Sequence, residues 1–264
     1  MLELKQGLRL ECLRQPFRQA LETAAQIGPE AIEVNGRTEL KPKDMSRTAV
    51  RHLRKMLADY QLKISAVNFP TRAGYSSLEM LEPKIEGTKA AMTMAYELGC
   101  NVVVNDVGPV PEDRESAAWQ TLTEALADIG QHGQRCGAWL AAKTCASSGD
   151  GSRLKELIDF LPVQSLLVDF DPSSFLLAEH SAVEAMKLLA EHVVNFRARD
   201  AVRDFSLGRG VEVELGRGSI DWAALLGMLE QKNYSGYITI DRDADSNPVA
   251  QCAQGLEYLS NLFS

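Results

Sequence analysis

The stretch from Leu166 to Ala201, LLVDFDPSSFLLAEHSAVEAMKLLAEHVVNFRARDA, decides the fold of this chain. An apolar run leads into Asp171 and Pro172, a loop and then a segment with helical periodicity follow, and a second apolar run ends at Arg197. This order predicts a strand, a helix and another strand. Because a helical crossover joins parallel neighbours, both strands should end at the same edge of one sheet. Ligand sites of parallel α/β folds lie at that edge, so Asp171 and Arg197 are predicted to be neighbours in a site.

The same alternation of short apolar runs and helical patterns continues along all 264 residues. Eight repeats in a chain of this size are typical of a (β/α)8 barrel, so we expect residues 1–264 to form a single TIM barrel domain. A doubly wound open sheet is the alternative, but no glycine-rich phosphate fingerprint follows the first predicted strand. The predicted strands are Leu8–Cys12, Ala31–Val34, Lys63–Val67, Asn101–Asn105, Ala138–Ala142, Leu166–Phe170, Val193–Phe196 and Gly236–Ile240, and the predicted helices are Phe17–Ile27, Ser46–Tyr60, Leu81–Leu98, Ala117–Gln134, Leu154–Leu161, a segment from Ala182, Trp222–Gln231 and Val249–Leu262.

The composition bounds the partners of the protein. A formal net charge of −8 argues against nucleic acid or an anionic membrane as a partner, because phosphate binding depends on clustered lysine and arginine. The start of the chain lacks a signal-peptide pattern, and no apolar run approaches the roughly 18 residues of a membrane span. Five scattered cysteines indicate neither a disulfide framework nor a zinc ribbon. We therefore expect a cytoplasmic protein with a small-molecule ligand, and a homo-oligomer is possible.

The glycine-rich segment from Asp204 to Ser219 has two interpretations. It is either a flexible cover over the site, with Arg209 and Arg217 available to anions, or an ordered surface hairpin that Ser219 caps ahead of the next helix.

Polar side chains stand at the carboxyl ends of nearly all predicted strands. A packed barrel would carry valine, isoleucine or leucine at core positions, so this row predicts a wet cavity that binds a small polar ligand. The residues are Glu11 or Cys12, Glu33 or Asn35, Asn68, Asn105, Lys143, Asp171, Arg197 and Asp241.

Four stretches resemble the xylose isomerase-like TIM barrels, the family of sugar phosphate isomerases and epimerases. They are VNFRARDAVRD, GRGVEVELGRGSIDWAALLGMLEQKNYSGYITIDRD, LLVDFDPSS and LKISAVNFPTRAGY. The resemblance implies one divalent metal, held by a glutamate ending strand 5, an aspartate after strand 6, a histidine on strand 7 and a glutamate ending strand 8. It also implies that the metal polarises a sugar carbonyl while the glutamates move a proton through an enediolate.

The implied metal ligands are mostly replaced in this chain. The strand 5 glutamate falls on Lys143, the strand 6 aspartate is kept as Asp171, the strand 7 histidine falls on Arg197, and the strand 8 glutamate falls on Asp241. At about 4 Å and an effective dielectric constant of about 20, each fixed cation would repel a divalent ion by roughly 8 kcal/mol. We therefore predict that a salt-bridge cluster of these four residues replaces the metal and that the protein uses no cofactor.

These inferences predict an isomerase-like or epimerase-like protein that moves a proton beside the carbonyl of a sugar, sugar phosphate or sugar acid. Asp171 or Asp241 would be the base, and Lys143 and Arg197 would stabilise the enediolate. One alternative is a non-catalytic carbohydrate binder. Another is a metal-dependent isomerase that holds Mn, Mg or Zn on Asp171 and Asp241, with Asp169 or Asp243 as shifted ligands. The residues predicted to bind substrate are Glu11, Asn35, Asn68, Arg72, Asn105, Ser174, Arg199 and Arg203.

Overall fold

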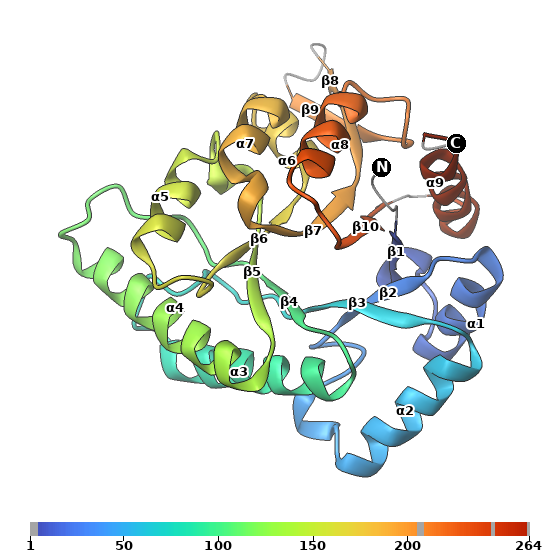
Figure 1. Cartoon of the computed structure of the whole chain (residues 1–264), viewed down its shortest axis with the longest axis horizontal. Helices are drawn as coiled ribbons and strands as arrows, with labels where there is room; N and C mark the ends of the chain where they lie inside the picture. Colours follow the sequence, from blue (N-terminus) through green and yellow to red (C-terminus); the bar gives the residue numbers. More distant parts are fainter. Residues whose placement is uncertain (1–4, 205–208, 244–245, 263–264) are drawn as a thin grey trace.

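Eight parallel strands close into a barrel in the computed structural model, which describes residues 5–204, 209–243 and 246–262 (Figure 1). Each strand pairs with its neighbours in parallel register, so all eight carboxyl ends meet at one mouth. The predicted TIM barrel fold is confirmed. In spatial order the strands are β1 (Lys5–Arg9), β10 (Tyr237–Ile240), β7 (Val193–Ala198), β6 (Leu167–Phe170), β5 (Trp139–Lys143), β4 (Val102–Asn105), β3 (Lys63–Asn68) and β2 (Ala31–Asn35), which pairs with β1 again.

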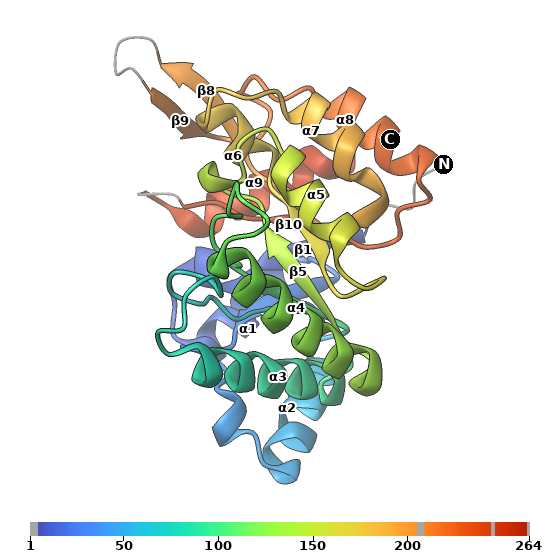
Figure 2. The ribbon, with the colours of Figure 1, turned by 90° about the vertical axis from the view of Figure 1, so that its left-hand side faces the viewer.

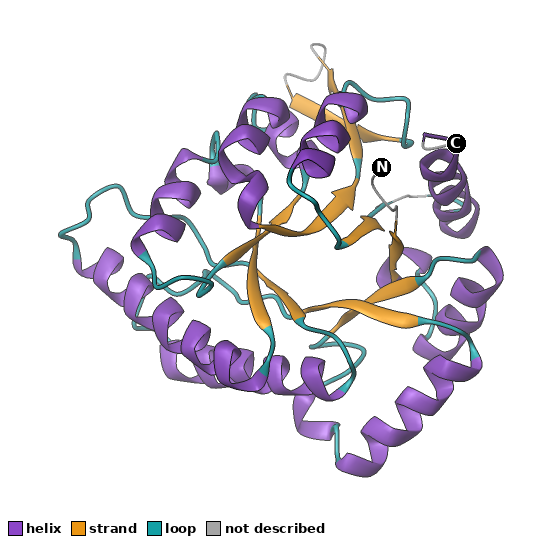
Figure 3. Ribbon diagram, viewed as in Figure 1, coloured by secondary structure: helices purple, strands orange, loops and turns teal. Residues whose placement is uncertain are grey.

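Helices surround the barrel on its outer side (Figure 3). In the described part of the chain, none of them combines the length and the apolar character that crossing a bilayer requires. The helices are α1 (Phe17–Ile27), α2 (Arg47–Asp59), α3 (Leu81–Glu97), α4 (Ala117–Cys136), α5 (Ser152–Phe160), α6 (Pro172–Leu177), α7 (Ala182–Leu189), α8 (Trp222–Gln231) and α9 (Pro248–Leu262), with short 3-10 turns η1 (Leu10–Leu13), η2 (Pro42–Asp44), η3 (Ala146–Ser148) and η4 (Ala190–His192).

Local sequence signals fix where several helices begin and end. The hydroxyl of Ser46 accepts the Ala49 amide at the start of α2, and the hydroxyl of Ser116 accepts the Trp119 amide at the start of α4. Gly28 ends α1 with a φ of 86°, a conformation that glycine adopts without strain. The chain then enters β2 three residues later, which keeps the connection short.

The first strand lies earlier than its predicted range. Leu8–Cys12 was the predicted strand, whereas β1 covers Lys5–Arg9 and the next residues form the turn η1. Arg9, rather than Glu11 or Cys12, is therefore the last residue of this strand. The apolar residues that suggested a strand, such as Leu10, are buried in both arrangements, so hydrophobicity alone did not fix the register.

The helical crossover after β6 consists of two helices instead of one. The carboxylate of Asp171 accepts the Ser173 amide and caps α6, and Pro172 occupies its first turn. The second helix, α7, begins after Ser181, whose hydroxyl accepts the Glu184 amide. Asp171 therefore follows the last residue of β6 and also caps the start of α6, at the mouth of the barrel.

The glycine-rich segment forms an antiparallel hairpin of β8 (Asp200–Asp204) and β9 (Arg209–Val213), which projects from the barrel (Figure 2). This supports the hairpin interpretation, although residues 205–208 lie outside the described part of the chain. Ser219 was predicted to cap the next helix, but Asp221 caps α8 through its side chain. That prediction was wrong by two residues.

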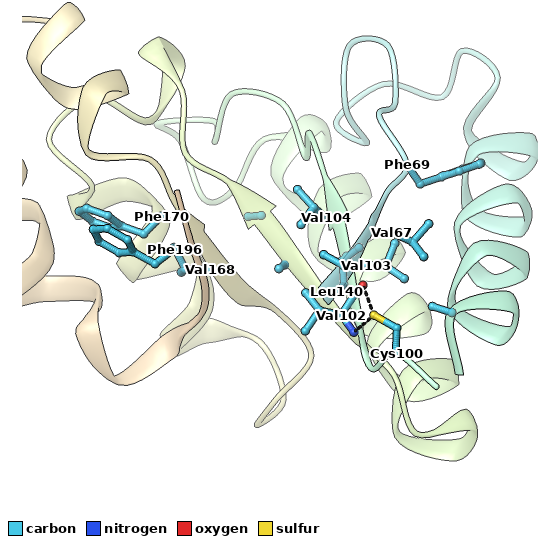
Figure 4. Packing of buried hydrophobic residues seen from close by; sticks show 14 of the residues in the cluster. Val67, Phe69, Cys100, Val102, Val103, Val104, Leu140, Val168, Phe170 and Phe196 are labelled. Carbon is cyan, nitrogen blue, oxygen red and sulfur yellow. Dashed lines mark hydrogen bonds between the residues drawn. The ribbon is translucent and has the colours of Figure 1, made fainter. Parts of the chain in front are cut away.

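Apolar packing lies mainly between the sheet and the helices. Phe170 stacks on Phe175 and Phe196, with ring centroids 5.0 and 5.8 Å apart. Figure 4 shows Phe170 and Phe196 together on one part of the sheet and Val67, Phe69 and other apolar residues on another. The inside of the barrel is different, because it contains fully buried charged side chains.

Candidate functional site

Arg197 on β7 lies at the centre of the barrel and is fully buried. Its Nε donates to Asp169 Oδ2 at 2.6 Å, and its Nη1 donates to Asp241 Oδ2 at 2.7 Å. Its Nη2 donates to both carboxylate oxygens of Glu33, at 2.9 and 3.2 Å. Asn195 Nδ2 donates to the other oxygen of Asp169 at 2.7 Å. One planar guanidinium thus joins three strands that are far apart in the sequence.

Two further cations converge on Asp241. Arg9 Nη1 donates to Asp241 Oδ1 at 2.9 Å, and its Nη2 contacts Glu11 at 2.9 Å. Lys143 Nζ lies 3.6 Å from Asp241 Oδ2, and the Lys143 side chain is 28% exposed. Asp241 therefore touches three cations, whereas the long contact to Lys143 leaves most of the ammonium's hydrogen-bonding capacity free for a ligand.

Asp171 belongs to a second ion-pair group. Its Oδ2 accepts from Arg199 Nη1 at 3.0 Å, and its Oδ1 accepts the Ser173 amide at 3.0 Å. Arg199 also pairs with Glu212 on the hairpin at 2.7 Å, and Arg242 pairs with the same glutamate at 2.6 Å. The predicted four-membered cluster is thus corrected: Lys143 and Arg197 do contact Asp241, but Asp171 pairs with Arg199.

The three buried carboxylates differ in their affinity for a proton. Burial would raise the pKa of Asp241, but Arg197, Lys143 and Arg9 together hold it well below its usual range. Burial raises the pKa of Asp171 despite the nearby Arg199. Burial also raises the pKa of Glu33, against the attraction of Arg197. Asp171 is therefore the better proton acceptor of the two aspartates at the mouth, and Asp241 is a permanent counterion.

The lowered pKa of Asp241 predicts a loss of stability in acid. Because the folded value lies below the usual 3.8, the stabilisation from Asp241 is complete above about pH 4 and is lost as the pH falls further. Urea unfolding of the wild-type protein and of Asp241→Asn between about pH 5 and pH 3 checks this. We expect the stability difference between them to shrink as the pH falls.

Glu33 and Asp171 act in the opposite direction, because their raised folded pKa values favour the folded state as they take up protons. Because the Asp241 carboxylate is among the charges that raise both pKa values, Asp241→Asn also reduces this opposing contribution. A stability difference that is constant from pH 5 to pH 3 would contradict the assignment.

Several predicted substrate-binding residues have structural contacts instead. Asn105 is fully buried and donates to the Phe69 carbonyl, and the hydroxyl of Ser174 donates to the Asp171 carbonyl. Asn35 accepts two amides of the following turn through its side chain. These contacts explain why polar residues follow the strands without requiring a ligand.

The other predicted residues occupy different surroundings. Glu11 is bonded to Arg9, and Asn68 is buried at the end of β3. Arg72 is exposed in the loop after β3, and Arg203 is exposed on β8. Arg199 contacts a charged group of the mouth through its pair with Asp171.

Arg209 and Arg217 were predicted to be available to anions if the glycine-rich segment covers the site. The side chain of Arg209 lies outside what the structure describes. Arg217 pairs with Glu214 at 2.9 Å on the surface and is 77% exposed. Beside this segment lies a pocket of about 270 Å³, lined by Arg199, Asp241 and Arg242 among others.

Three functional candidates were missed in the sequence analysis or were not assigned a definite role. Asp169 and Glu33 are the deepest partners of Arg197, and Arg9 is the second guanidinium on Asp241. Strand periodicity offered a signal for Asp169. Residues two apart in a strand face the same side, so Asp169 should face the same side as Asp171. Glu39 is a fourth: burial raises its pKa to about 7, and the nearby Glu11 carboxylate adds to the shift.

The donor set does not fit the divalent metal that the family resemblance implies. The positions expected to supply a glutamate and a histidine carry Lys143 and Arg197, which have no lone pair to donate. The oxygens of Asp169 and Asp241 already accept bonds from cations and Asn195. Among the described residues, no group of three or more potential ligands is arranged to hold a metal ion.

Comparisons with known proteins place the chain. Residues 21–262 match the family model described as xylose isomerase-like TIM barrel, and no curated protein matches the chain in sequence. The fold is similar to a xylose isomerase domain protein from Planctomyces limnophilus, with a TM-score of 0.80 and 23% identity over 92% of this chain and 91% of that one. It is also similar to a D-tagatose 3-epimerase-like protein, with a TM-score of 0.79 and 19% identity over 98% and 96%.

A third similar structure is a xylose isomerase-like TIM barrel protein from Mycobacterium smegmatis in complex with magnesium. Its TM-score is 0.77, and it is 15% identical over 92% of this chain and 87% of that one. At these identities the structures show the shared fold, while the family model covers nearly the whole sequence. The chain belongs to the xylose isomerase-like TIM barrel family.

Proposed function

We propose that the protein is a metal-independent relative of the sugar isomerases and epimerases, and that it moves a proton beside the carbonyl of a small sugar or sugar acid. One observation carries the proposal: Lys143 stands partly exposed at the barrel mouth, 3.6 Å from Asp241, and its charge also acts on Asp171, the carboxylate whose pKa burial raises. A fixed cation next to a proton acceptor supplies the two groups that enolisation needs.

Asp171 is the proposed base. Its carboxylate would take the proton from the carbon beside the carbonyl, and the electron pair of that bond would move onto the carbonyl oxygen. Asp241 is unsuited to this role because three cations hold its pKa well below the usual range. Delivery of a proton to the same carbon from the other face, by water or another acid, gives an epimer, and the proton taken up by Asp171 is then released to solvent. Return of the proton to the former carbonyl carbon, with transfer of the hydroxyl proton to the former carbonyl oxygen, gives an isomer.

Lys143 is the proposed electrostatic partner of the developing oxyanion. In relatives that hold a divalent ion, such as the protein described with magnesium, an ion is available for this purpose. Here an ammonium with one long contact to Asp241 could turn towards a substrate oxygen. Arg199 would hold a carboxylate or phosphate group of the substrate through Nη2, the guanidinium nitrogen that neither of its two carboxylate partners contacts.

A second candidate function, a non-catalytic carbohydrate binder, is favoured by the tight filling of the mouth. Both oxygens of Asp171 already accept bonds, and its side chain is 1% exposed. The pocket that Lys143 lines with Val107 and Cys145 holds only about 10 Å³. For catalysis, Asp171 Oδ2 would have to exchange its hydrogen bond from Arg199 Nη1 for the substrate proton.

Deuterium exchange distinguishes the two functions. A panel of sugars, sugar phosphates and sugar acids is first screened by thermal shift, and each stabilising ligand is then incubated with the protein in D2O and followed by NMR. An enzyme exchanges the proton beside the carbonyl, whereas a binder stabilises without exchange. We expect Lys143→Met and Asp171→Asn each to slow exchange by about 10² or more.

Lys41→Met is the matched control, because Lys41 is an exposed lysine outside the ion pairs that build the mouth. Exchange that survives both site variants at the wild-type rate would overturn the proposed roles. Exchange that requires added metal and is abolished by a chelator would overturn the metal-independent mechanism.

A further inference from the structure

Epimerisation beside a carbonyl requires a proton to leave one face of the reacting carbon and a proton to arrive on the other. A base and an acid that carry out these two steps must stand on opposite sides of the substrate. In the proposed reaction the base is Asp171, which directly follows β6. An acid for the second step should therefore belong to the side of the mouth that faces β6.

The loop after β2 lies on that side. In the closed barrel of eight strands, β2 is the fourth neighbour of β6 in both directions, so the two strands face each other across the barrel (Figure 1). Asn35 is the last residue of β2, and Glu39 follows it in the loop at the mouth. Glu39 and Asp171 thus stand on opposite sides of the mouth.

Contacts within this loop orient the Glu39 side chain. Its Oε2 accepts the backbone amide of Asn35 at 2.6 Å, and the Glu39 amide donates to the Asn35 carbonyl at 3.0 Å. Its Oε1 accepts no hydrogen bond from the described residues and is not fully buried. One carboxyl oxygen of Glu39 is therefore available to a ligand.

Glu39 differs from other carboxylates of the mouth, because no lysine or arginine in the described ranges forms an ion pair with it. Glu11 and Asp241 both bond to Arg9. Although burial acts in the opposite direction, hydrogen bonds from Asn35 and Arg9 lower the pKa of Glu11. The surrounding cations lower the pKa of Asp241 in the same way. Both groups stay ionised and are poor proton donors.

The surroundings of Glu39 favour its protonated form. Burial raises its pKa to about 7. The carboxylates of Glu11 and Glu33 add to the rise, and Arg9 opposes it. A carboxyl group with such a value holds a proton in a large share of the molecules at neutral pH, as a general acid must. Glu33 cannot take this role itself, because it is fully buried against Arg197.

We propose that Glu39 is the acid that protonates the reacting carbon on the face opposite Asp171, so that the protein is an epimerase. This inference rests on the proposed reaction at the mouth. Asp171 takes the proton from one face, and the electron pair of the broken C–H bond moves onto the carbonyl oxygen beside Lys143. Glu39 then gives its proton to the other face of the same carbon, and the electron pair returns to form the new C–H bond and the carbonyl. Asp171 ends protonated and Glu39 ionised, and proton exchange with water restores both.

Four ketoses with a hydrogen on the stereocentre beside the carbonyl test the proposal on the whole protein in D2O: D-fructose, D-ribulose, D-ribulose 5-phosphate and 5-keto-D-gluconate. NMR follows two events at that carbon, exchange of the proton and formation of the epimer. The wild-type protein should convert at least one probe to its epimer, with one deuterium at the inverted carbon. Glu39→Gln should slow epimer formation by about 10² or more and slow exchange much less, because Asp171 is retained. Glutamine can still accept the Asn35 amide, so the loop is preserved.

Two further variants isolate the acid. Glu30→Gln is the matched control, because the carboxylate of Glu30 also accepts a backbone amide, from Gln6 at 3.2 Å, but at the other end of β2. It should leave both rates unchanged. Glu39→Asp keeps a carboxyl group and should retain more epimer formation than Glu39→Gln.

Epimer formation at the wild-type rate in Glu39→Gln would overturn the role of Glu39 and leave the proposed function in place. Equal losses in Glu39→Asp and Glu39→Gln would have the same meaning, as would exchange by the wild-type protein without any epimer. If the wild-type protein exchanges the proton of none of the four probes, the proposed function fails and this inference fails with it.

Discussion

Arg197→Met should destabilise the folded protein by about 3–5 kcal/mol, the largest single-residue effect that we expect. The substitution keeps a long side chain but removes the guanidinium that bonds to Glu33, Asp169 and Asp241. Three buried carboxylates would then face one another without the cation between them. Urea unfolding at neutral pH measures the loss directly.

Arg199→Met is the matched control for this prediction. Arg199 also bonds to two carboxylates, but its side chain is 24% exposed, so water can enter the space that it leaves beside Asp171 and Glu212. We expect a clearly smaller loss for this variant. If Arg197→Met does not fold, Glu33→Gln measures one arm of the same network, and an unchanged stability in Glu33→Gln would contradict the account.

A triple variant, Lys143→Glu, Arg197→His and Asp241→Glu, should gain a divalent-metal site. The substitutions restore the residue types that the family resemblance implies, next to the retained Asp171, and they leave excess negative charge in the barrel. We expect Mn²⁺ to stabilise this variant by about 2.7 kcal/mol when its concentration is a hundred times the dissociation constant. The wild-type protein should not respond to the ion.

Two controls isolate the guanidinium. Lys143→Glu with Asp241→Glu keeps Arg197, which should continue to occupy the carboxylates, so this double variant should respond weakly or not at all. Equal stabilisation of the wild-type protein and the triple variant by Mn²⁺ would show that the natural residues already form a metal site, which contradicts the argument from the donor set.

The fold could be predicted from the sequence because its signals are local and repeated. Short apolar runs, helical periodicity and stops such as Gly28 indicate a (β/α)8 barrel without any knowledge of long-range contacts. The errors occurred where two local structures satisfy the same pattern. Leu10 is buried in a 3-10 turn, and its apolar side chain would fit a buried strand equally well. A loop was predicted after Asp171 and Pro172, but the helix α6 begins there directly.

The candidate site could be predicted only in part, because ion pairing inside a barrel depends on depth. The sequence indicated that Arg197 and Asp241 lie on adjacent strand ends, and the structure places them 2.7 Å apart. It did not indicate that the Arg197 side chain reaches Glu33, whose strand β2 lies three strands away around the closed sheet. That contact depends on barrel closure and side-chain length, which no local pattern encodes.

The pairing of Asp171 illustrates the same difficulty at shorter range. Asp171 and Arg197 are close in the fold, but the hydrogen bond goes to Arg199, two residues further along the chain. Both arginines fit a strand with a period of two, so the sequence could not choose between them. The choice depends on how far each side chain stands above the barrel interior.

A crystal structure of protein grown and crystallised with Mn²⁺, with diffraction data collected at the manganese edge, tests the central claim most directly. The account predicts no anomalous peak at Asp171 or Asp241 and continuous density from the Arg197 guanidinium to Glu33, Asp169 and Asp241. A manganese ion at full occupancy, bonded to Asp171 and Asp241 with Arg197 turned away, would contradict it.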